Sequence, residues 1–461
     1  MSNTVDVLVV GAGACGLAAA VAAHDSGATV AVLEKLDRPG GNSSLSTGSV
    51  PAAASRYQRA AGIDDDPDRF YADLMRISGG SDCPELVRRL VDTSAATVEW
   101  LVDAIEARMV FISAYKHIGH TVPRLHAPVS RRGQDLVDDL LAAVAKREIP
   151  LAVGNAVAEL MVEGGAVVGV LVDAGRGAPE EVRAGKVILA VNGFAANRDL
   201  VARFCPEIAG AAYFGARGST GEAIAWGERL GADLGNMGAY QGYAAVSDPH
   251  GSLLSWTTVE KGGILLNARG ERFGDESRGY SGYTPTVMAQ GGPCYALFDQ
   301  RIFDIACAEE EFVELWKYGG LKTGATPDEA MSPYGLDASS VAAAVDTYQA
   351  AARGERADPF GRRDFGIAPL LGPFYSCRVV PGLFHTQGGL KVDGDGRVLR
   401  SDGLPIPNLF AGGGAVAGLS GRTGAAGYAS GNGLLSAIGL GRLAGLAAAA
   451  EITAASGHLA S

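Results

Sequence analysis

A short apolar segment leads directly into a Gly-x-Gly-x-x-Gly turn near the N-terminus, and no other feature constrains the fold as strongly. Residues 5–10 are mostly valine and leucine, which is typical of a buried parallel strand. Gly11 then permits a tight turn, Gly13 lets a pyrophosphate approach the backbone, and Gly16 lets a helix pack on the strand. The pattern predicts a strand–turn–helix unit that binds phosphate groups at the N-terminus of the helix.

The residues that follow complete the pattern of a dinucleotide-binding unit. We expect a helix over 17–26 and a second strand over 29–33 that ends at Glu34. Glu34 lies roughly 20 residues beyond the glycines, where a carboxylate can accept hydrogen bonds from a ribose diol. Ala12, inside the turn, belongs to the same expected cofactor contact. The plainer alternative is an ordinary glycine-rich turn, but strand, helix, strand and acid together favour dinucleotide binding.

The segment after Glu34 indicates which dinucleotide is bound. It is rich in glycine and hydroxyl residues, which a flavin needs because its ribityl chain and ring must pass close to backbone amides. The segment resembles the FAD-binding segment of the fumarate reductase and succinate dehydrogenase flavoprotein family, which carries Gly-Gly-Asn followed by small residues. Members with covalent flavin usually have a histidine here, whereas this segment has none, so we expect noncovalent FAD. The resemblance implies cofactor contacts at Lys35, Gly41, Asn42, Ser43, Ser44, Thr47 and Gly48.

Length and composition fit a two-domain protein and argue against several other classes. A chain of 461 residues is too long for one simple core, and a net charge of −12 argues against nucleic acid or an anionic membrane as partner. The six cysteines form no Cys-x-x-Cys pair, which argues against a zinc ribbon or an iron–sulfur cluster and suits a reducing cytoplasm. The apolar run 434–450 is interrupted by Arg442 and by glycines, so we expect a buried helix and no membrane span.

Periodicity and the resemblance together imply an α/β fold: a Rossmann-like FAD-binding domain of the glutathione-reductase type with an inserted α+β cap domain. The expected FAD-binding domain covers 1–225 and 356–461, and the expected substrate-capping domain covers 226–355. Within the first part we expect helices over 67–77, 84–107 and 134–147, and a polar loop over 115–130. Strands are expected over 152–160, 167–172 and 181–187.

The resemblance covers nearly the whole chain. Residues 373–390 resemble the family's Pro-Phe-Tyr, Pro-Gly and His-Thr-x-Gly-Gly-Leu segment, which implies that His385 lies near the flavin ring. The glycines 412–414 also resemble a nicotinamide-binding fingerprint, but no ribose acid follows at the expected distance. The resemblance implies further cofactor contacts at Val157, Asn192, Gly193, Gly413, Gly414, Gly433, Leu434 and Leu435.

Two departures from the dicarboxylate reductases of this family bear on the substrate. Those enzymes carry a Gln-x-His-Pro-Thr stretch whose histidine binds a substrate carboxylate, and residues 241–245 at the corresponding place contain no histidine. They also carry a C-terminal arginine that pairs with a second carboxylate, and Tyr428 stands at that position. Arg422 is the nearest substitute, although the register disfavours it. Since a phenol cannot replace a bidentate guanidinium, we do not expect fumarate or succinate as the substrate.

The stretch Tyr428-x-Ser430-Gly431 resembles the corresponding stretch of the 3-ketosteroid dehydrogenases, in which a tyrosine and a glycine backbone amide hold a ketone oxygen. The resemblance implies that Tyr428 and Ser430 occupy catalytic positions. Polarising a carbonyl acidifies its α C–H, so a base can remove that proton while the β hydrogen leaves as hydride to flavin N5. The reverse reaction reduces a conjugated double bond. The plainer alternative is that Tyr428 only packs against the flavin.

The proton-transfer group is expected in the cap domain. The family's Arg-Phe-x-Asn-Glu stretch, followed by an arginine or tyrosine, resembles residues 272–280 and offers Arg278 and Tyr280, which the sequence does not separate. A structural ion pair of Arg278 with Glu276 or Asp275 is the plainer reading. Further candidates are Tyr243 and Tyr283.

Three main functions remain open at this point, besides isomerisation of an enone by the same residues. The leading one is an FAD-dependent oxidoreductase that acts on CH–CH groups of a small, fairly apolar carbonyl compound, with an unidentified electron donor or acceptor. The second keeps an organic-acid substrate bound by Arg278, His385 and Arg422. The third is an electron-transfer subunit that docks on an iron–sulfur partner. The histidines His117, His120 and His126 have no regular metal-ligand spacing and are interpreted as loop residues, with a place at the edge of the cofactor or substrate site as the alternative.

Overall fold

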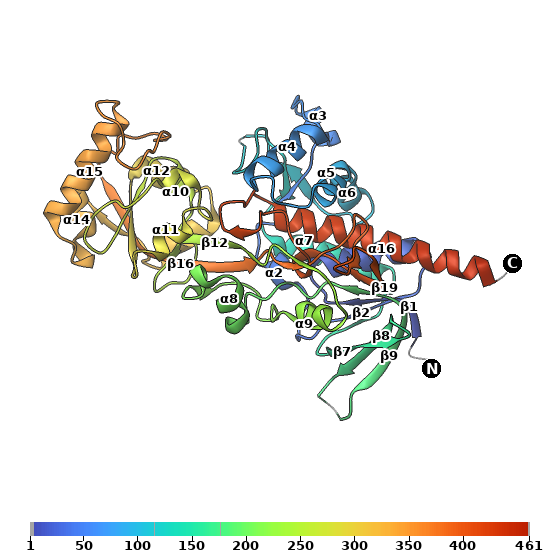
Figure 1. Ribbon diagram of the computed structural model, residues 1–461. Helices are drawn as coiled ribbons and strands as arrows, with labels where there is room; N and C mark the ends of the chain where they lie inside the picture. The colour runs from blue at the N-terminus through green and yellow to red at the C-terminus, as the bar shows by residue number, and fades with distance from the viewer. Residues whose placement is uncertain (1–3, 115, 176, 460–461) are drawn as a thin grey trace. The chain divides into compact units, whose positions relative to one another are not determined.

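The computed structural model describes residues 4–114, 116–175 and 177–459 (Figure 1). The chain divides into two compact units: the first consists of Met1–Cys205, Gly215–Tyr240 and His385–Ser461, and the second of Pro206–Phe214 and Gln241–Phe384. Two long strands, β12 (Gly238–Ser247) and β16 (Phe374–Thr386), contain residues of both units. The bounds of the two units therefore fall inside strands. A change in composition along the sequence predicts the inserted domain over 226–355, and the second unit consists mainly of Gln241–Phe384.

Apolar parallel strands form the main sheet of the first unit. The strand order is β18-β19-β9-β1-β2-β6, and all neighbours are parallel except the antiparallel pair β18–β19. Val7, Leu8 and Val9 in β1 have no exposed surface, as expected for a strand buried on both faces. The antiparallel strands β7 and β8 extend the sheet from β9. The bounds are Thr4–Val10 (β1), Val30–Leu33 (β2), Leu151–Ala152 (β6), Ala156–Glu163 (β7), Ala166–Asp173 (β8), Glu180–Leu189 (β9), Arg397–Leu399 (β18) and Pro405–Ala411 (β19).

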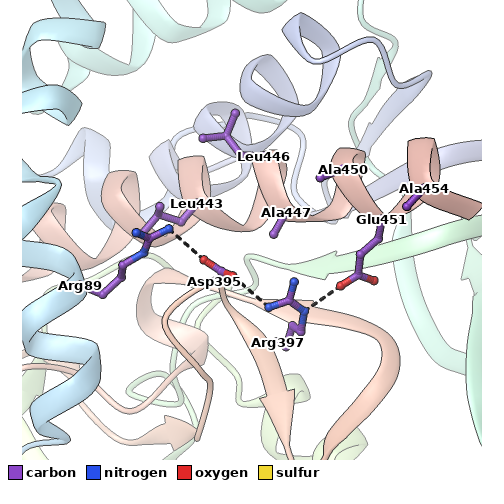
Figure 2. A pocket seen from close by; sticks show the side chains of 9 residues that line it. All are labelled: Arg89, Asp395, Arg397, Leu443, Leu446, Ala447, Ala450, Glu451 and Ala454. Atoms are coloured by element: carbon purple, nitrogen blue, oxygen red, sulfur yellow. Dashed lines mark hydrogen bonds and ion pairs between the residues drawn. The ribbon is translucent and has the colours of Figure 1, made fainter.

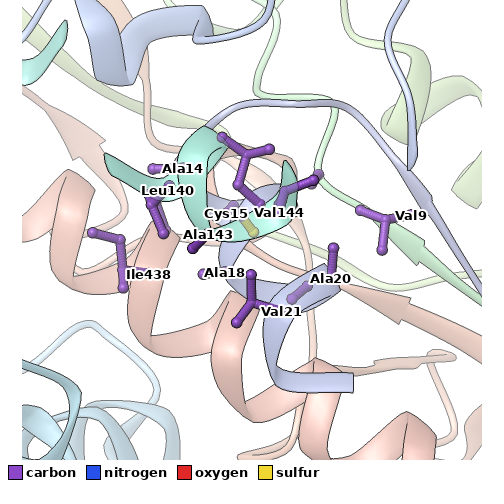
Figure 3. Packing of buried hydrophobic residues seen from close by; sticks show 14 of the residues in the cluster. Val9, Ala14, Cys15, Ala18, Ala20, Val21, Leu140, Ala143, Val144 and Ile438 are labelled. Carbon is purple, nitrogen blue, oxygen red and sulfur yellow. The ribbon is translucent and has the colours of Figure 1, made fainter. Parts of the chain in front are cut away.

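The first and last helices of this unit pack backbone to backbone. Helix α1 (Ala14–Asp25) is made mostly of small residues and lies against α16 (Asn432–Leu459). A Cβ at Gly441 would lie 2.3 Å from Cys15 O, and one at Gly445 would lie 2.3 Å from Ala19 O, so only glycine permits this approach. Figure 3 shows the small side chains of α1 together with Leu140 of α7 (Gly133–Lys146). These contacts place Gly441, inside α16, beside Cys15 at the start of α1.

Helix α16 is the one described segment with the length and hydropathy of a membrane span. In its most apolar 18-residue window, however, 78% of the residues are buried inside the protein. The helix is therefore part of the core, as the interrupted apolar run predicts. None of the six cysteines forms a disulfide.

The structure corrects two local predictions. The helix expected over 84–107 is two helices, α5 (Pro84–Asp92) and α6 (Ser94–Asp103), because the Thr93 and Ser94 hydroxyls donate to the carbonyls of Arg89 and Val91 and interrupt the turn between them. The expected loop over 115–130 contains the buried strand β5 (Leu125–Pro128), which pairs with β3 (Val50–Pro51) and β4 (Met109–Phe111). Other elements of the first unit are α2 (Gly41–Ser44), α3 (Arg56–Ala60), α4 (Pro67–Ile77), α8 (Arg198–Phe204), α9 (Glu222–Arg229), β11 (Leu234–Gly235), β17 (Gly389–Leu390), η4 (Gly413–Ala415) and β20 (Thr423–Gly424).

The second unit is built on an antiparallel sheet with an aromatic core. Its strands β13, β14 and β16 pair antiparallel, and β15 and β10 pair with β16. Buried rings such as Phe298, Phe303 and Tyr375 stack on one another within it. The bounds are η1 (Pro206–Ile208), β10 (Ala212–Tyr213), α10 (Thr257–Glu260), β13 (Ile264–Leu266), η2 (Glu276–Arg278), α11 (Thr284–Met288), β14 (Cys294–Asp299), α12 (Gln300–Ala306), α13 (Glu310–Lys317), β15 (Lys322–Gly324), α14 (Pro327–Met331), η3 (Ser332–Tyr334) and α15 (Ala338–Ala352).

Candidate active site

The three glycines of the N-terminal turn meet different surroundings. Gly11 has φ +106°, and a Cβ there would lie 2.3 Å from Ala190 O. A Cβ at Gly16 would lie 1.8 Å from Gly11 O, so this glycine allows α1 to approach the turn. At Gly13, by contrast, a Cβ would meet only Gly40 O, at 3.6 Å. The second glycine therefore leaves space beside the first amides of α1, where a phosphate group fits.

Glu34 lies where the sequence predicts a ribose-binding acid. Its Oε2 accepts a hydrogen bond from Ala12 N at 2.9 Å, and its Oε1 accepts one from Leu36 N, also at 2.9 Å. Two oxygens offer about four acceptor sites, so a diol can still bind. Lys35 instead donates to Thr220 Oγ1 at 2.7 Å and forms an ion pair with Glu222. Its ammonium group therefore holds part of the first unit together.

The glycine- and hydroxyl-rich segment lies alongside the first turn. Gly40 N donates to Ala12 O at 2.9 Å, and Gly40 forms a parallel bridge with Gly13. Ser43 Oγ accepts from Ala14 N at 3.3 Å, so this hydroxyl lies at the N-terminus of α1. The remaining predicted residues support the local backbone: Asn42 Oδ1 accepts from Ala216 N, Ser44 Oγ donates to Gly41 O, Thr47 Oγ1 hydrogen-bonds Ser49 Oγ, and Gly48 has φ +70°.

Two further glycine turns lie at the carboxyl ends of β9 and β19. Asn192 has φ +65°, and its side chain accepts from Gly193 N at 2.9 Å and donates to Ser219 Oγ at 2.8 Å. A Cβ at Gly414 would lie 2.2 Å from Asn192 Oδ1, so the two turns are in contact. Gly413 has φ +61° and lies over Cys15 of α1. Val157 lies further away along the chain, in β7 beside Val172.

His385 lies against the first turn of α16. Its ring atoms Cε1 and Nε2 are each 3.7 Å from the position of a Cβ at Gly433. Burial lowers the pKa of His385 to about 4, so the half-buried ring is neutral at pH 7. Leu434 N and Leu435 N both donate to Gly431 O. The positive end of the helix dipole therefore lies beside a neutral imidazole, an arrangement that favours negative charge on a bound group.

Tyr428 and Ser430 lie on the buried turn that leads into α16. Their exposed fractions are 9% and 8%. Asn432, the next polar residue, donates from Nδ2 to Leu419 O at 2.6 Å. Its buried Oδ1 has no partner within the described part of the chain. Arg422 is exposed, and its Nε donates to Ser81 O at 3.3 Å. Its guanidinium therefore has a partner other than the buried residues of this turn.

The structure also brings to this turn His120, which the sequence analysis assigns to the polar loop over 115–130. His120 Nε2 lies 2.8 Å from Ser430 O, and burial lowers the pKa of this imidazole to about 4. Arg124, which is fully buried, lies beside it and binds Asp65 and Asp73. No periodicity or motif marks these residues in the sequence. Among the described residues, no group of three or more histidine, cysteine, aspartate or glutamate side chains is placed to hold a metal ion.

The candidates of the second unit differ in their surroundings. Arg278 is exposed, and Glu276, its proposed structural partner, pairs with Arg272 and Arg362 instead. Tyr280 is half-buried, and its ring centroid is 5.1 Å from that of Tyr243.

Two other tyrosines of this unit lie in its core. The Tyr243 hydroxyl donates to Leu254 O at 2.9 Å. The Tyr283 side chain is completely buried, with no partner for its hydroxyl within the residues described. Burial raises the pKa of both phenols above the ordinary value. These contacts favour a packing role for Tyr243 and Tyr283.

A groove of about 400 Å³ lies beside the C-terminal half of α16, but it contains none of the predicted site residues. Figure 2 shows its apolar floor, which includes Leu443 and Leu446, and its rim of alternating charges. The rim is closed by ion pairs of Arg89 with Asp395 and of Arg397 with Asp395 and Glu451. These pairs neutralise the charged groups, so the groove offers no reactive side chain.

The residues of the first unit fit FAD. The open face at Gly13, the spare acceptors of Glu34 and the unpartnered Asn432 Oδ1 all lie on the predicted cofactor segments. A side chain at Gly13 or at Gly41, whose Cβ would meet only Gly13 Cα at 4.0 Å, would occupy this space. The fit thus rests on space and hydrogen-bonding capacity that the protein itself leaves unused.

Comparison with known proteins agrees with this reading. The FAD binding domain family matches residues 6–434. The chain is 32% identical over 421 residues to an NADH:fumarate oxidoreductase of Klebsiella pneumoniae (strain 342); the match covers 90% of this chain and 45% of that protein, so the chain spans about half the length of this relative.

Two solved structures share the fold. A flavocytochrome c3 fumarate reductase in an open conformation has a TM-score of 0.83 and 27% identity, covering 97% of this chain and 78% of that one. The 3-ketosteroid-Δ4-(5α)-dehydrogenase of Rhodococcus jostii RHA1, solved with 4-androstene-3,17-dione, has a TM-score of 0.77 and 26% identity, covering 97% of each chain. The chain therefore belongs to the FAD binding domain family and is an FAD-dependent oxidoreductase of the fumarate reductase type that acts on carbon–carbon bonds.

Proposed function

We propose that this protein desaturates, or in the reverse direction reduces, the carbon–carbon bond next to a carbonyl group in a fairly apolar substrate. The observation that carries the proposal is the residue at the N-terminus of α16. Tyr428 is a buried phenol at the position where the resemblance puts the carboxylate-binding arginine, while Arg422 is exposed and donates to Ser81 O. A phenol donates one hydrogen bond, which suits a ketone or ester oxygen better than a carboxylate.

The proposed chemistry divides between the two hydrogens of the reacting bond. The Tyr428 hydroxyl donates to the carbonyl oxygen and stabilises the negative charge that develops there, which acidifies the α C–H. When bound, FAD supplies the two-electron acceptor or donor that takes or gives the β hydrogen as hydride at N5. Gly433 lies in the first turn of the long helix α16, whose positive dipole end favours extra negative charge beside it, and the neutral His385 ring lies against the same turn.

We assign the proton transfer to Tyr280, with Arg278 as the alternative. A guanidinium stays protonated throughout the accessible pH range and cannot serve as a base in desaturation, whereas a phenol can act in both directions. Tyr280 also has an aromatic neighbour in Tyr243, while Arg278 is exposed. Comparing Tyr280→Phe with Arg278→Gln distinguishes the two candidates, because only replacement of the residue that transfers the proton should slow the proton-transfer step.

A second candidate function is the reduction of an unsaturated organic acid. The Klebsiella relative is named for fumarate, and Arg278 could bind a carboxylate. Under this alternative His385 and Arg422 complete the carboxylate site. For the external electron carrier we propose only a class, a one- or two-electron donor or acceptor. The compartment we propose is the cytoplasm, which suits six cysteines without a disulfide.

Anaerobic photoreduction of the purified holoenzyme, followed by reoxidation with a substrate panel, tests the proposal. The panel contains 2-cyclohexenone and 4-androstene-3,17-dione as enones, and fumarate, urocanate and acrylate as unsaturated acids. We expect fast recovery of flavin absorbance with the enones and a large loss of that rate in Tyr428→Phe. Tyr375→Phe, which removes a buried hydroxyl bonded to Gln300, is the matched control. Recovery with the acids alone would replace the proposal by the second candidate.

The same preparations test how FAD is held. Because residues 35–48 contain no histidine, we propose that the flavin is noncovalent. Acid precipitation should then release all of the flavin into the supernatant. Flavin that stays with the pellet would contradict this.

A further inference from the structure

The loop Ile118–His120 holds the backbone of the Tyr428–Ser430 turn at three points. Ser430 N donates to Ile118 O at 3.0 Å, and Ser430 O lies 2.8 Å from His120 Nε2. Between them, Gly119 has φ +88°, and a Cβ there would lie 2.4 Å from Ala429 Cβ. Both backbone groups of Ser430 are thus bound by a single loop, and Ala429 packs directly on its glycine.

Arg124 fixes which nitrogen of His120 carries the proton. Its Nη1 lies 3.4 Å from His120 Nδ1, and a guanidinium has only donors. Nδ1 is therefore the acceptor, and the Ser430 carbonyl, which can only accept, likewise requires the proton on Nε2. The imidazole remains neutral because burial lowers its pKa to about 4.

Arg124 is itself held rigidly. It donates from Nε and Nη2 to the two oxygens of Asp65, at 2.7 and 2.8 Å, and from Nη1 to Asp73 Oδ2 at 2.5 Å. Asp73 also accepts from Thr121 N and Thr121 Oγ1 at 2.8 Å, so the same carboxylate anchors the residue after His120. The Phe70 ring lies 4.7 Å below the guanidinium. The buried ion pairs thus hold Arg124 in place, Arg124 contacts the His120 ring, and the His120 ring binds Ser430 O.

We propose that His120 is a positioning residue: its Nε2–H fixes the Ser430 carbonyl, and with it the direction of the Tyr428 side chain two residues earlier, while Arg124 fixes the His120 tautomer. The inference rests on the proposed function, in which Tyr428 binds the substrate carbonyl. A donor must lie within a fraction of an ångström of the developing oxyanion, and a 1 Å misplacement can reduce a rate about a hundredfold. His120 does not touch substrate in this account.

The pair His120→Gln and His120→Asn tests the inference. A glutamine amide can replace Nε2 and still donate to Ser430 O, whereas an asparagine amide reaches only the Nδ1 position. We expect His120→Gln to keep kcat for 2-cyclohexenone within about threefold and His120→Asn to lower kcat at least tenfold, with KM and bound flavin little changed. Amide hydrogen exchange of the peptide around 428–433 should rise in the asparagine variant only.

His126 provides the matched control. It is a buried histidine of the same unit, its pKa is also lowered to about 4, and its Nε2 hydrogen-bonds Ser55 Oγ at 2.9 Å. His126→Gln and His126→Asn should change thermal stability without distinguishing the two amides in kcat. Equal kcat for the two His120 variants would overturn the inference. Full activity of Tyr428→Phe would overturn the proposed function instead, and the exchange measurement would still show whether His120 holds the turn.

Discussion

Replacing Gly13 with alanine should weaken FAD binding and leave the fold intact. At Gly13 φ is −79° and ψ is 179°, values that alanine adopts without strain. The new Cβ would meet only Gly40 O, at the ordinary contact distance of 3.6 Å. Restricting the unfolded chain stabilises the protein by about 0.4–1 kcal/mol. Losing glycine at the N-cap of α1 costs a similar amount. The free energy of unfolding of the apoprotein should therefore change by less than about 1 kcal/mol.

The same methyl group occupies the space that we assign to the pyrophosphate. Losing one hydrogen bond to a charged group costs about 1.5–3 kcal/mol, which corresponds to a rise in Kd of about ten- to a hundredfold. Fluorescence titration of apoprotein with FAD measures Kd, and thermal unfolding of the same sample measures stability. Gly16→Ala is the counterpart, because its Cβ would lie 1.8 Å from Gly11 O and should disrupt the apoprotein itself. The reasoning is refuted if Gly13→Ala binds FAD as tightly as the parent protein, or if both variants lose the same Tm.

Three further outcomes are expected. Tyr428→Phe should lower kcat for an enone about a hundred- to a thousandfold with an unchanged flavin spectrum, and a rate near that of the parent would mean that the phenol only packs. Arg124→Met should lower the free energy of unfolding by about 3–5 kcal/mol, because it leaves the Asp65 and Asp73 carboxylates buried without their cation. Calorimetry measures this, and a Tm within about 2 °C of the parent would contradict it. Finally, burial lowers the pKa of four histidines to about 4, against about 6.5 in the unfolded chain. Their contribution to the free energy of unfolding is complete above pH 6.5 and is lost as the pH falls to 4, at up to about 1.4 kcal/mol per pH unit for each histidine. Urea unfolding that gives the same free energy of unfolding at pH 6.5 and pH 5 would contradict this. These histidines are His117, His120, His126 and His385.

The cofactor unit was predictable because its signal is local. The alternation of strand, glycines, helix and acid over residues 5–34 reports on one βαβ unit, and the structure confirms each element within it. The break at Thr93 and the strand β5 escaped prediction for a different reason. The Thr93 hydroxyl binds Arg89 O, four residues earlier, and apolar periodicity does not report such a contact. The short strand β5 depends on pairing with residues 50–51, which lie far away in the sequence.

The support beneath the Tyr428 turn was not predictable. His120 and Ser430 are separated by 310 positions in the chain, and Arg124 gains its role only from carboxylates of the preceding helical region. A lone histidine in a polar segment carries no periodic signal that would distinguish it from His117 or His126. The glycine at 119 is the one sequence feature that fits the observed contact, since any larger residue would collide with Ala429.

The contact between α1 and α16 also has a consequence for how the protein is made. The ribosome completes α16 roughly 400 residues after α1. At about 5–20 residues per second this interval lasts on the order of a minute. During that time the small-residue face of α1 lacks its partner, and the sheet grows in stages, with β9 pairing with β1 first and β19 pairing with β9 later. The second unit, most of which is the continuous segment Gln241–Phe384, is synthesised in full before then. The inserted unit can therefore fold first, and the cofactor-binding unit around it closes last.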